Sequence, residues 1–303
     1  MSSSFGSYDV AGFVKAPVYF YRSWWLANIS FYDAGRPPLP NTGLFVHIVE
    51  SWQAPPPPKT NRSITVYTNA PTVALSVNGA RVGVAPVAPW GAAFFHGVVF
   101  SPGTLTATAL DAHGAPLGSA EKASWGAASA LVLAIDAPSA ASGTGVAVLQ
   151  DGQDVALIRA TVVDAAGVIV AGAGGFNVSF SVTAGPALVW ATSSGDPADH
   201  VTAHSPWRMT YHGLLRAVVR STVRAAGSDA RRALEALVNK EAGAGPASST
   251  IAQGGSAPAA SFTVTATCPG LVPASVVVPL SVAEEDGVLA VAARSVGAAY
   301  VGE

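Results

Sequence analysis

Short segments of alternating hydrophobic and polar residues dominate this chain. Residues 64–77 alternate in this way and end at the pair Asn78-Gly79, after which a second apolar-polar segment begins. An Asn-Gly pair between two such segments is the strongest short signal for a β-hairpin. The pattern therefore predicts two antiparallel strands joined by a tight turn.

The same pattern recurs towards the C-terminus. Turn signals at residues 111–114 and 164–167 separate paired segments, and further alternating runs cover 176–182, 214–224, 261–267 and 274–282. Short strands separated by turns are typical of antiparallel sandwiches and not of a parallel α/β sheet. We therefore predict a mainly β protein with two immunoglobulin-like antiparallel β-sandwiches.

Helical signals are confined to two segments. Residues 16–28 are apolar on nearly all sides, with Tyr19, Tyr21, Trp24 and Trp25, so a helix there should be buried against a larger body. Residues 228–242 begin with a capping serine and carry a narrow apolar stripe, which predicts a helix on the surface.

Changes in composition indicate the domain boundaries. Residues 54–59 form a stiff proline-rich spacer, and residues 134–145 form a link of small residues. A Gly, Ala, Ser and Pro run at 243–260 joins the second helix in one insertion. The expected units are an N-terminal segment at 1–36, a strand and proline-rich linker at 37–59, a first sandwich at 60–133, a second sandwich at 134–283 with an insertion at 228–260, and a tail at 284–303.

Composition argues against several classes of protein. The 303 residues include 16 Lys and Arg and 18 Asp and Glu, too few basic residues for the concentrated basic face of a nucleic-acid-binding protein. The single cysteine, Cys268, excludes an internal disulfide and a four-cysteine zinc site. The longest uncharged apolar stretch, residues 264–283, contains Pro269, Pro273 and Pro279, which would break a membrane-spanning helix. We expect neither a nucleic-acid partner nor a membrane span.

One cluster of polar residues suggests two alternatives. Asp196, Asp199, His200 and His204 form either a metal site or a turn with solvated polar groups, and the nearby Pro197 favours the turn. The sequence contains neither a nucleophile elbow nor a glycine-rich phosphate loop between a strand and a helix. We therefore expect no metal and no cofactor.

Tryptophan side chains are the candidate sugar contacts, because an exposed indole can stack on a sugar ring. Trp52, Trp125 and Trp190 lie in or beside apolar strands, and core packing is their expected role. Trp90 and Trp207 lie among turn residues and are the candidate carbohydrate contacts. The neighbouring Arg208 is expected to form a salt bridge or a stack at the surface.

A dense motif near the N-terminus resembles part of a known family. Its matching residues are Phe5, Gly6, Asp9, Val10, Gly12, Phe13, Lys15, Tyr19, Tyr21, Ser23, Trp24 and Trp25. This run is similar to the stretch with which enzymes of glycoside hydrolase family 2, the β-galactosidase and β-glucuronidase family, leave the catalytic (β/α)8 barrel and form its last helix. The resemblance implies that residues 1–36 are a remnant of such a barrel.

The resemblance continues through most of the chain, from Phe5 to about Val282. It includes residues 44–52, 66–83, 149–164 and 263–271, as well as the triplets at 194–196 and 211–213 and Arg208. The family usually has Asn at the position of Ser194. By resemblance, the chain is the non-catalytic C-terminal part of a family 2 enzyme, and its parent reaction is hydrolysis of terminal β-glycosides, above all β-galactosides, in carbohydrate metabolism.

The resemblance also implies the absence of a catalytic site. Both catalytic glutamates of the family precede the segment that opens this chain, and a retaining glycosidase needs two carboxylates about 5–5.5 Å apart. We therefore assign no catalytic residue and expect the chain to be inactive alone, whether it is a truncated gene product or a separate protein. The expected partners are a catalytic barrel supplied by another chain and carbohydrate.

A second hypothesis belongs to another functional class. The sandwiches would then act as a stand-alone carbohydrate-binding or adhesion module at the cell surface, through Trp90 or Trp207. The resemblance favours an extracellular or cell-surface location, and the sequons at Asn28, Asn61 and Asn177 are compatible with it.

The N-terminal helix is expected to lack a partner for much of its apolar surface. We therefore predict that residues 1–36 are loosely held and promote self-association. The alternative is that the helix docks on the first sandwich.

Overall fold

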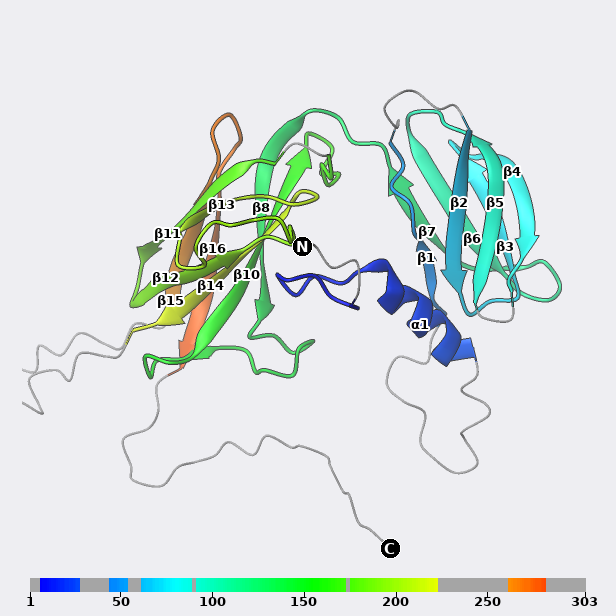
Figure 1. The fold of residues 1–303 in the computed structure, drawn as a ribbon. Coiled ribbons are helices and arrows are strands. Elements are labelled where there is room, and N and C mark those ends of the chain that lie inside the picture. The colour runs from blue at the N-terminus through cyan, green and yellow to red at the C-terminus, as the bar shows by residue number, and fades with distance from the viewer. Residues whose placement is uncertain are drawn as a thin grey trace, which may run out of the picture.

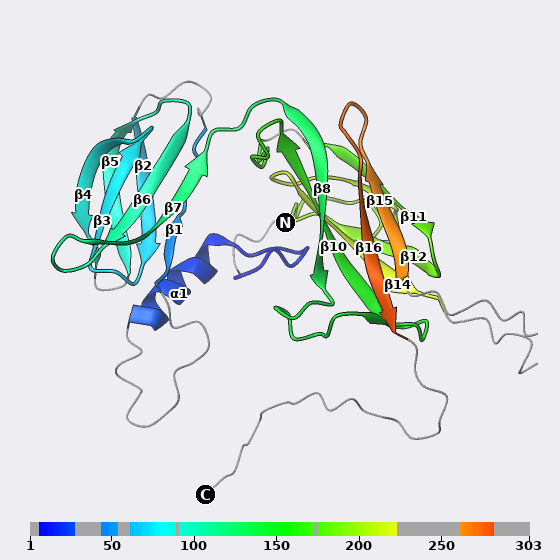
Figure 2. The same cartoon turned by 180° about the vertical axis from the view of Figure 1, so that it is seen from behind.

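The computed structural model describes residues 6–27, 44–53, 61–88, 91–172, 175–222 and 261–281. Within these ranges the chain forms two β-sandwiches, with an N-terminal segment between them that contains the helix α1 (Ala16–Ala27). Both views, Figure 1 and Figure 2, show this segment reaching from one sandwich to the other. The prediction of a mainly β, antiparallel sandwich fold is confirmed.

The first sandwich packs a three-stranded sheet on a four-stranded sheet, and all strand pairs are antiparallel. The sheets are, in spatial order, β1 (Val46–Ile48), β2 (Asn61–Thr68) and β5 (Ala92–Val99), and β4 (Ala80–Pro86), β3 (Thr72–Val77), β6 (Thr104–Leu110) and β7 (Pro116–Ala123). The predicted hairpin joins β3 to β4, where Asn78 and Gly79 both have positive φ angles, as a type I′ turn requires.

Trp52 lies at the centre of the first core. Its side chain is fully buried against the cluster that includes Ile64, Leu75 and Leu105, and its indole N–H donates to the carbonyl of Ser101 at 3.0 Å. The core role predicted for Trp52 is therefore confirmed. Because β1 pairs with β2, the strand expected within the linker at 37–59 adds to the first sandwich.

The second sandwich packs a four-stranded sheet on a five-stranded sheet. The sheets are, in spatial order, β12 (Ala187–Ser193), β14 (Leu214–Ser221), β10 (Val155–Asp164) and β8 (Ala128–Ala137), and β13 (Trp207–Met209), β11 (Asn177–Ala184), β15 (Ser261–Thr267), β16 (Ala274–Ser281) and β9 (Val148–Leu149). Only the pair β16–β9 is parallel among these described strands. Alternating Ala, Val, Leu and Phe side chains from both sheets form the core.

Strand β8 places the boundary between the sandwiches earlier in the chain than the sequence pattern predicted. It pairs with β10 from Ala128 to Ala137, so the second sandwich begins before residue 134, where the sequence pattern placed it. The strand is rich in alanine, which weakens its pattern, but Leu131, Leu133 and Ile135 alternate towards the second core. The link between the sandwiches is correspondingly short.

This link is tied to both sandwiches. The hydroxyl of Ser124 donates to the carbonyl of Trp52 at 2.8 Å, and the N–H of Gly126 donates to the carboxylate of Asp164 at 2.7 Å. Two hydrogen bonds within three residues restrict how the sandwiches rotate about the link.

The apolar stretch weighed as a membrane span forms strands β15 and β16 over its described residues. In the described part of the chain, no helix combines the length and apolar character needed to cross a bilayer. The spacer at 54–59, the helix expected at 228–242, the insertion at 228–260 and the tail at 284–303 lie outside the described residues.

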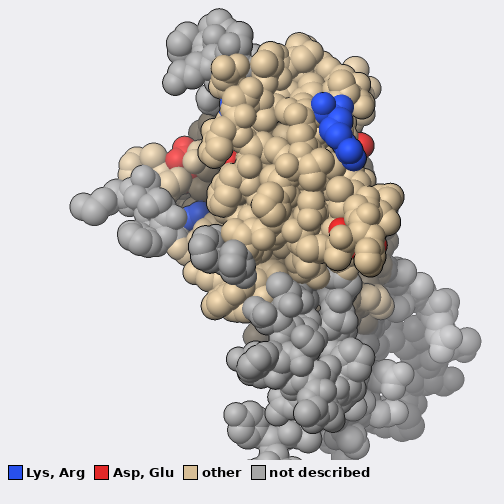
Figure 3. Space-filling view, turned by 90° about the vertical axis from the view of Figure 1, so that its right-hand side faces the viewer, with Lys and Arg blue, Asp and Glu red and all other residues tan. Residues whose placement is uncertain are grey.

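Charged side chains are sparse on the side of the first sandwich where β4 and β5 lie, as Figure 3 shows. Val82, Val84 and Phe94 are exposed on these two strands, each of which ends its sheet. Exposed apolar surface is therefore not restricted to the N-terminal segment. An exposed residue of these strands, Phe94, can serve as a control for substitutions in α1.

Candidate docking site

The helix α1 docks on the first sandwich through one face. The ring of Tyr19 stacks on His47 with centroids 3.7 Å apart, and Phe20 meets Tyr67 edge-on at 5.4 Å. The buried hydroxyl of Ser23 lies 3.2 Å from the carbonyl of Gly91, to which it donates. The structure thus shows α1 docked on the first sandwich, which is the alternative to the loosely held helix that we predicted.

His47 lies in the interface between α1 and the first sandwich. Burial, with a smaller contribution from the positive charge of Lys122, lowers the pKa of His47 from 6.5 to about 4. Burial also lowers the pKa of Lys122, while burial and the nearby Glu50 raise the pKa of Tyr67. The interface therefore favours an uncharged imidazole against Tyr19.

Acidification should weaken this interface. Between pH 6.5 and about 4 the unfolded chain binds a proton at His47 that the folded chain does not, so stability is lost as the pH falls through this window. We expect a loss of about 1–2 kcal/mol, reduced by the partial exposure of the ring. Urea unfolding at several pH values measures it.

The matched variants are His47→Gln and His96→Gln, the second on the exposed face of β5. The first should remove part of the pH dependence in this window, and the second should retain it. An unchanged pH dependence in His47→Gln would show that the imidazole is not responsible.

A tight turn ahead of α1 docks on the second sandwich. The carboxylate of Asp9 accepts the N–H groups of Ala11 at 2.9 Å and Phe13 at 2.8 Å, and Gly12 has a φ of 79°. Asp9 thereby closes the turn and directs the ring of Phe13 towards the second sandwich.

Two glycines allow the turn and the second sandwich to approach closely. A Cβ atom on Gly195 would lie 2.0 Å from the carboxylate of Asp9, and one on Gly12 would lie 2.8 Å from the guanidinium of Arg216. Any larger residue at Gly195 would therefore displace Asp9. The N-terminal motif and the triplet at 194–196, which lie far apart in sequence, meet at this contact.

Arg216 on β14 connects the turn to the sheet. Its guanidinium lies 4.5 Å from the centre of the Phe13 ring and donates to Asp136 on β8 at 2.6 Å. Arg159 also pairs with Asp136, at 3.4 Å. The N-terminal segment is therefore attached to the second sandwich by its turn and to the first by its helix.

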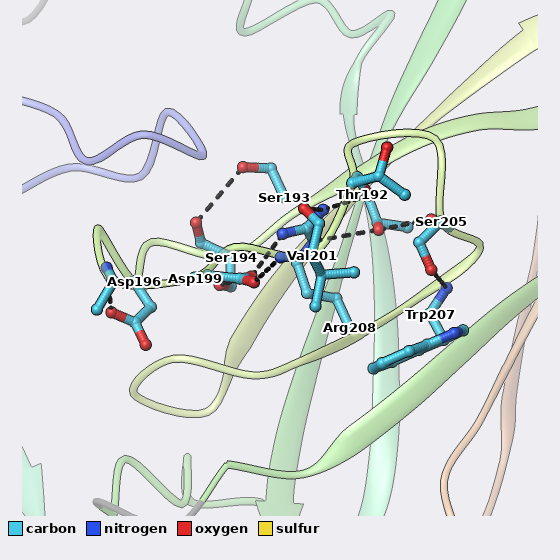
Figure 4. Close-up of polar contacts among 11 residues, drawn as sticks. Thr192, Ser193, Ser194, Asp196, Asp199, Val201, Ser205, Trp207 and Arg208 are labelled. Atoms are coloured by element: carbon cyan, nitrogen blue, oxygen red, sulfur yellow. Dashed lines mark hydrogen bonds and ion pairs between the residues drawn. The ribbon is translucent and has the colours of Figure 1, made fainter.

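The loop at 194–206 is held by a buried arginine, shown in Figure 4. Arg208 is only 5% exposed, and its guanidinium donates to the carboxylate of Asp199 at 2.5 Å. It also donates to the carbonyls of Val201 at 2.9 Å and Thr202 at 2.8 Å. The expectation of a surface residue was wrong for Arg208: alternation along β13 directs it inwards, where it forms a buried salt bridge.

Ser194 takes part in the same network, since its hydroxyl donates to Asp199 at 3.1 Å. Burial alone would raise the pKa of Asp199, but the N–H of Val201 and the guanidinium of Arg208 together hold it below its usual value. The carboxylate is therefore ionised, and its hydrogen bonds to Ser194, Val201 and Arg208 hold the loop together. A serine at position 194 still supplies a donor where the family usually has asparagine.

The residues weighed as metal ligands lie in this loop and its turns. Asp196 accepts the N–H of Ala198 at 2.8 Å, and Nδ1 of His204 lies 2.9 Å from the carbonyl of Trp190. Within the ranges that the structure describes, no three His, Cys, Asp or Glu side chains are placed to hold a metal ion. The geometry is that of a turn closed by its own side chains.

The tryptophans occupy different environments. Trp125 packs partly buried against the second core, as predicted, and Trp90 lies outside the described residues. Trp190 is 40% exposed, so its predicted core role was wrong. An irregularity in the pairing of β12 with β14 leaves it unpaired in the strand register, and the guanidinium of Arg220 lies 3.6 Å from the centre of its ring. Trp207 is also 40% exposed, which keeps it available as a sugar contact.

The outer face of α1 is the main aromatic surface left uncovered among the described residues of the N-terminal segment. Trp24 is 42% and Trp25 66% exposed, and Tyr21 stacks on Trp25 with centroids 5.6 Å apart. The apolar pattern of residues 16–28 predicted a helix buried against a larger body, and these side chains are the part of it that the described residues leave uncovered. The exposed side chains of Val10 and Val14 belong to the turn that precedes this helix.

Comparisons with known proteins match this architecture. Residues 145–233 match the model of the glycoside hydrolase family 2 C-terminal domain 5, and residues 59–118 match a domain of unknown function, DUF4982. No curated protein matches the chain. Residues 145–233 therefore resemble a domain found in the C-terminal region of glycoside hydrolase family 2 enzymes.

Several solved structures share this fold. A glycosyl hydrolase family 2 member from Bacteroides cellulosilyticus superposes with a TM-score of 0.65 at 19% identity over 91% of this chain, and a β-glycosidase from Bacteroides vulgatus with 0.66 at 18% over 91%. A β-glucuronidase from glycoside hydrolase family 2 gives 0.63 at 22% over 92%. The chain spans only 32%, 28% and 23% of these three proteins. The resemblance to the C-terminal region of glycoside hydrolase family 2 enzymes is thus confirmed.

Proposed function

We propose that this chain is the non-catalytic C-terminal portion of a family 2 glycoside hydrolase, and that it supports a catalytic barrel packed on the outer face of α1. One observation carries the proposal: α1 is fixed by a buried contact face, while its opposite face exposes Tyr21, Trp24 and Trp25. Exposed aromatic patches of this kind are typical of interaction surfaces. In this proposal, residues 1–36 are the remnant of the barrel's last helix.

This chain spans only part of the length of the similar solved proteins, so the proposed barrel must be supplied by other residues. Since the chain spans about a third or less of the three solved proteins, the barrel comes either from another part of a longer protein or from a separate chain. The parent reaction we propose is hydrolysis of terminal β-glycosides, with β-galactosides as the first substrates to test. The β-glycosidase and the β-glucuronidase among the similar structures support β-glycoside chemistry in general.

The chain alone should be catalytically silent. The two described glutamates are both engaged by neighbouring strands: Glu50 accepts the N–H of Thr65 at 2.7 Å, and Glu121 accepts the hydroxyl of Thr106 at 3.2 Å. We expect no release of nitrophenol from aryl β-galactoside or β-glucuronide above the rate of a Glu50→Gln/Glu121→Gln control prepared in the same way. Turnover by the wild type that the control lacks would contradict the proposal.

The supporting role has its own test. A purified family 2 barrel expressed from the parent coding sequence should bind the full chain, and binding should fall at least about tenfold when Tyr21, Trp24 and Trp25 are replaced by serine. The Phe94→Ser variant serves as the control, since Phe94 is an exposed aromatic residue on the edge strand β5 and is not part of α1. Equal binding by all three proteins would overturn the assignment of this face.

A further inference from the structure

The outer face of the five-stranded sheet in the second sandwich carries no charged side chain at the described outward positions of β11, β13, β15 and β16. Inward positions hold the core, for example Phe180, Phe262 and Val264. Many of the outward positions hold hydroxyl groups, namely Ser179, Ser181, Thr183, Thr265, Thr267 and Ser275. Such a face is unusual, because exposed sheet surfaces normally include charged residues.

Hydrogen bonds between side chains fix the positions of some of these hydroxyl groups. The hydroxyls of Thr183 and Thr265 lie 3.1 Å apart, and those of Thr265 and Ser275 lie 2.8 Å apart. The row crosses β11, β15 and β16, whose spacing in a sheet is about 4.8 Å. A hydroxyl group can both donate and accept a hydrogen bond, which matches the hydroxyl groups of a sugar chain.

Trp207 borders this face on strand β13. It is paired in register with Ser179, and no ring or cation among the described residues covers its indole. Its neighbour Arg208 points inwards and fixes the strand through four donated hydrogen bonds to Asp199, Thr192, Val201 and Thr202. The exposed indole therefore has a rigid support and an open ring face.

The opposite sheet of the same sandwich has different chemistry. Its outward positions include Arg159, Arg216 and Arg220, with Asp136 as the acidic partner of the first two. Trp190 on that side is as exposed as Trp207, but Arg220 lies over its ring. An acidic ligand would favour the arginine-bearing sheet, whereas the uncharged sheet offers it no counter-charge.

From this contrast we infer that the uncharged face bordered by Trp207 binds a neutral polysaccharide. The indole stacks on the apolar face of a sugar ring, and the Ser and Thr hydroxyls of β11, β15 and β16 bond to the hydroxyls of the following sugars. This binding surface is separate from α1, so the inference does not depend on whether a barrel docks on α1. It gives the chain a function that requires no catalytic residue.

Affinity electrophoresis of the full chain tests the inference. The probes are four neutral polysaccharides (β-glucan, galactan, xylan and galactomannan), with polygalacturonate as the acidic comparison. We expect migration to be retarded in at least one neutral polysaccharide, and any retardation in polygalacturonate to be unaffected by Trp207→Ala, because an acidic polymer would favour the arginine-bearing sheet. Trp207→Ala should weaken the retardation about tenfold, as loss of a central aromatic contact does.

Trp190→Ala is the matched control, because it removes an equally exposed indole from the other sheet and should leave retardation unchanged. A second variant, Ser181→Lys, places a charge within the hydroxyl row without altering the core and should also abolish binding; thermal unfolding confirms that each variant is folded. No retardation in any neutral polysaccharide, or retardation that depends on Trp190 and not on Trp207, would overturn the inference.

Discussion

Replacing Arg208 by alanine should lower the free energy of unfolding of the second sandwich by about 3–5 kcal/mol. The substitution leaves the charged carboxylate of Asp199, whose side chain is only 12% exposed, without its arginine partner, and it also leaves the carbonyls of Val201 and Thr202 without this donor. Removing one member of a buried pair costs far more than the pair itself contributes. Urea unfolding followed by circular dichroism measures this loss.

Arg159→Ala is the control for charge alone. Arg159 also pairs with a carboxylate, but 42% of its side chain is exposed, and Arg216 remains to pair with Asp136. We expect a loss below about 1 kcal/mol. If Arg208→Ala cost no more than Arg159→Ala, the network in Figure 4 would not be what holds the loop at 194–206.

Deletion of residues 1–36 should have two separate effects. It removes the contacts of Tyr19 and Phe20 with the first sandwich and the contact of Phe13 with Arg216, so the melting temperature should fall by about 5–10 °C. It also removes the exposed face of α1, so self-association should decrease. Differential scanning calorimetry and light scattering measure the two effects independently.

The two effects together distinguish a helix that is docked and exposes an interaction face from a helix that is purely structural or loosely held. A lower melting temperature with unchanged association would show that α1 is an integral part of a self-sufficient fold with no exposed docking face. Unchanged stability with reduced association would show that the N-terminal segment is loosely held after all, as its sequence suggested.

The strands were predictable because their signals are local. Alternation in β2, β10 and β14, and the Asn78-Gly79 turn, depend on residues that are adjacent in the chain. Strand β8 was partly missed because alanine contributes little to an apolar pattern. Trp190 was misassigned because the irregular pairing of β12, and not the hydrophobicity of its residues, turns the side chain outwards.

The contacts between segments were not predictable from local patterns. Asp9 and Gly195 meet only because the N-terminal turn folds back on the second sandwich, and neither residue alone signals a partner. The family resemblance had placed both in matching motifs without indicating that they touch. Similarly, Arg208 resembled a surface residue until the direction of β13 placed it inside.

The outer face of α1 is central to the proposed role of this chain, because a barrel would have to dock there. Sedimentation velocity of the wild type, the Tyr21→Ser/Trp24→Ser/Trp25→Ser variant and the Phe94→Ser control at the same concentrations tests this directly. We predict that the wild type and the control self-associate, whereas the triple variant sediments as a monomer with an unchanged melting temperature. If the triple variant associated like the wild type, or melted several degrees lower, the proposal that α1 presents a docking face for a barrel would be contradicted.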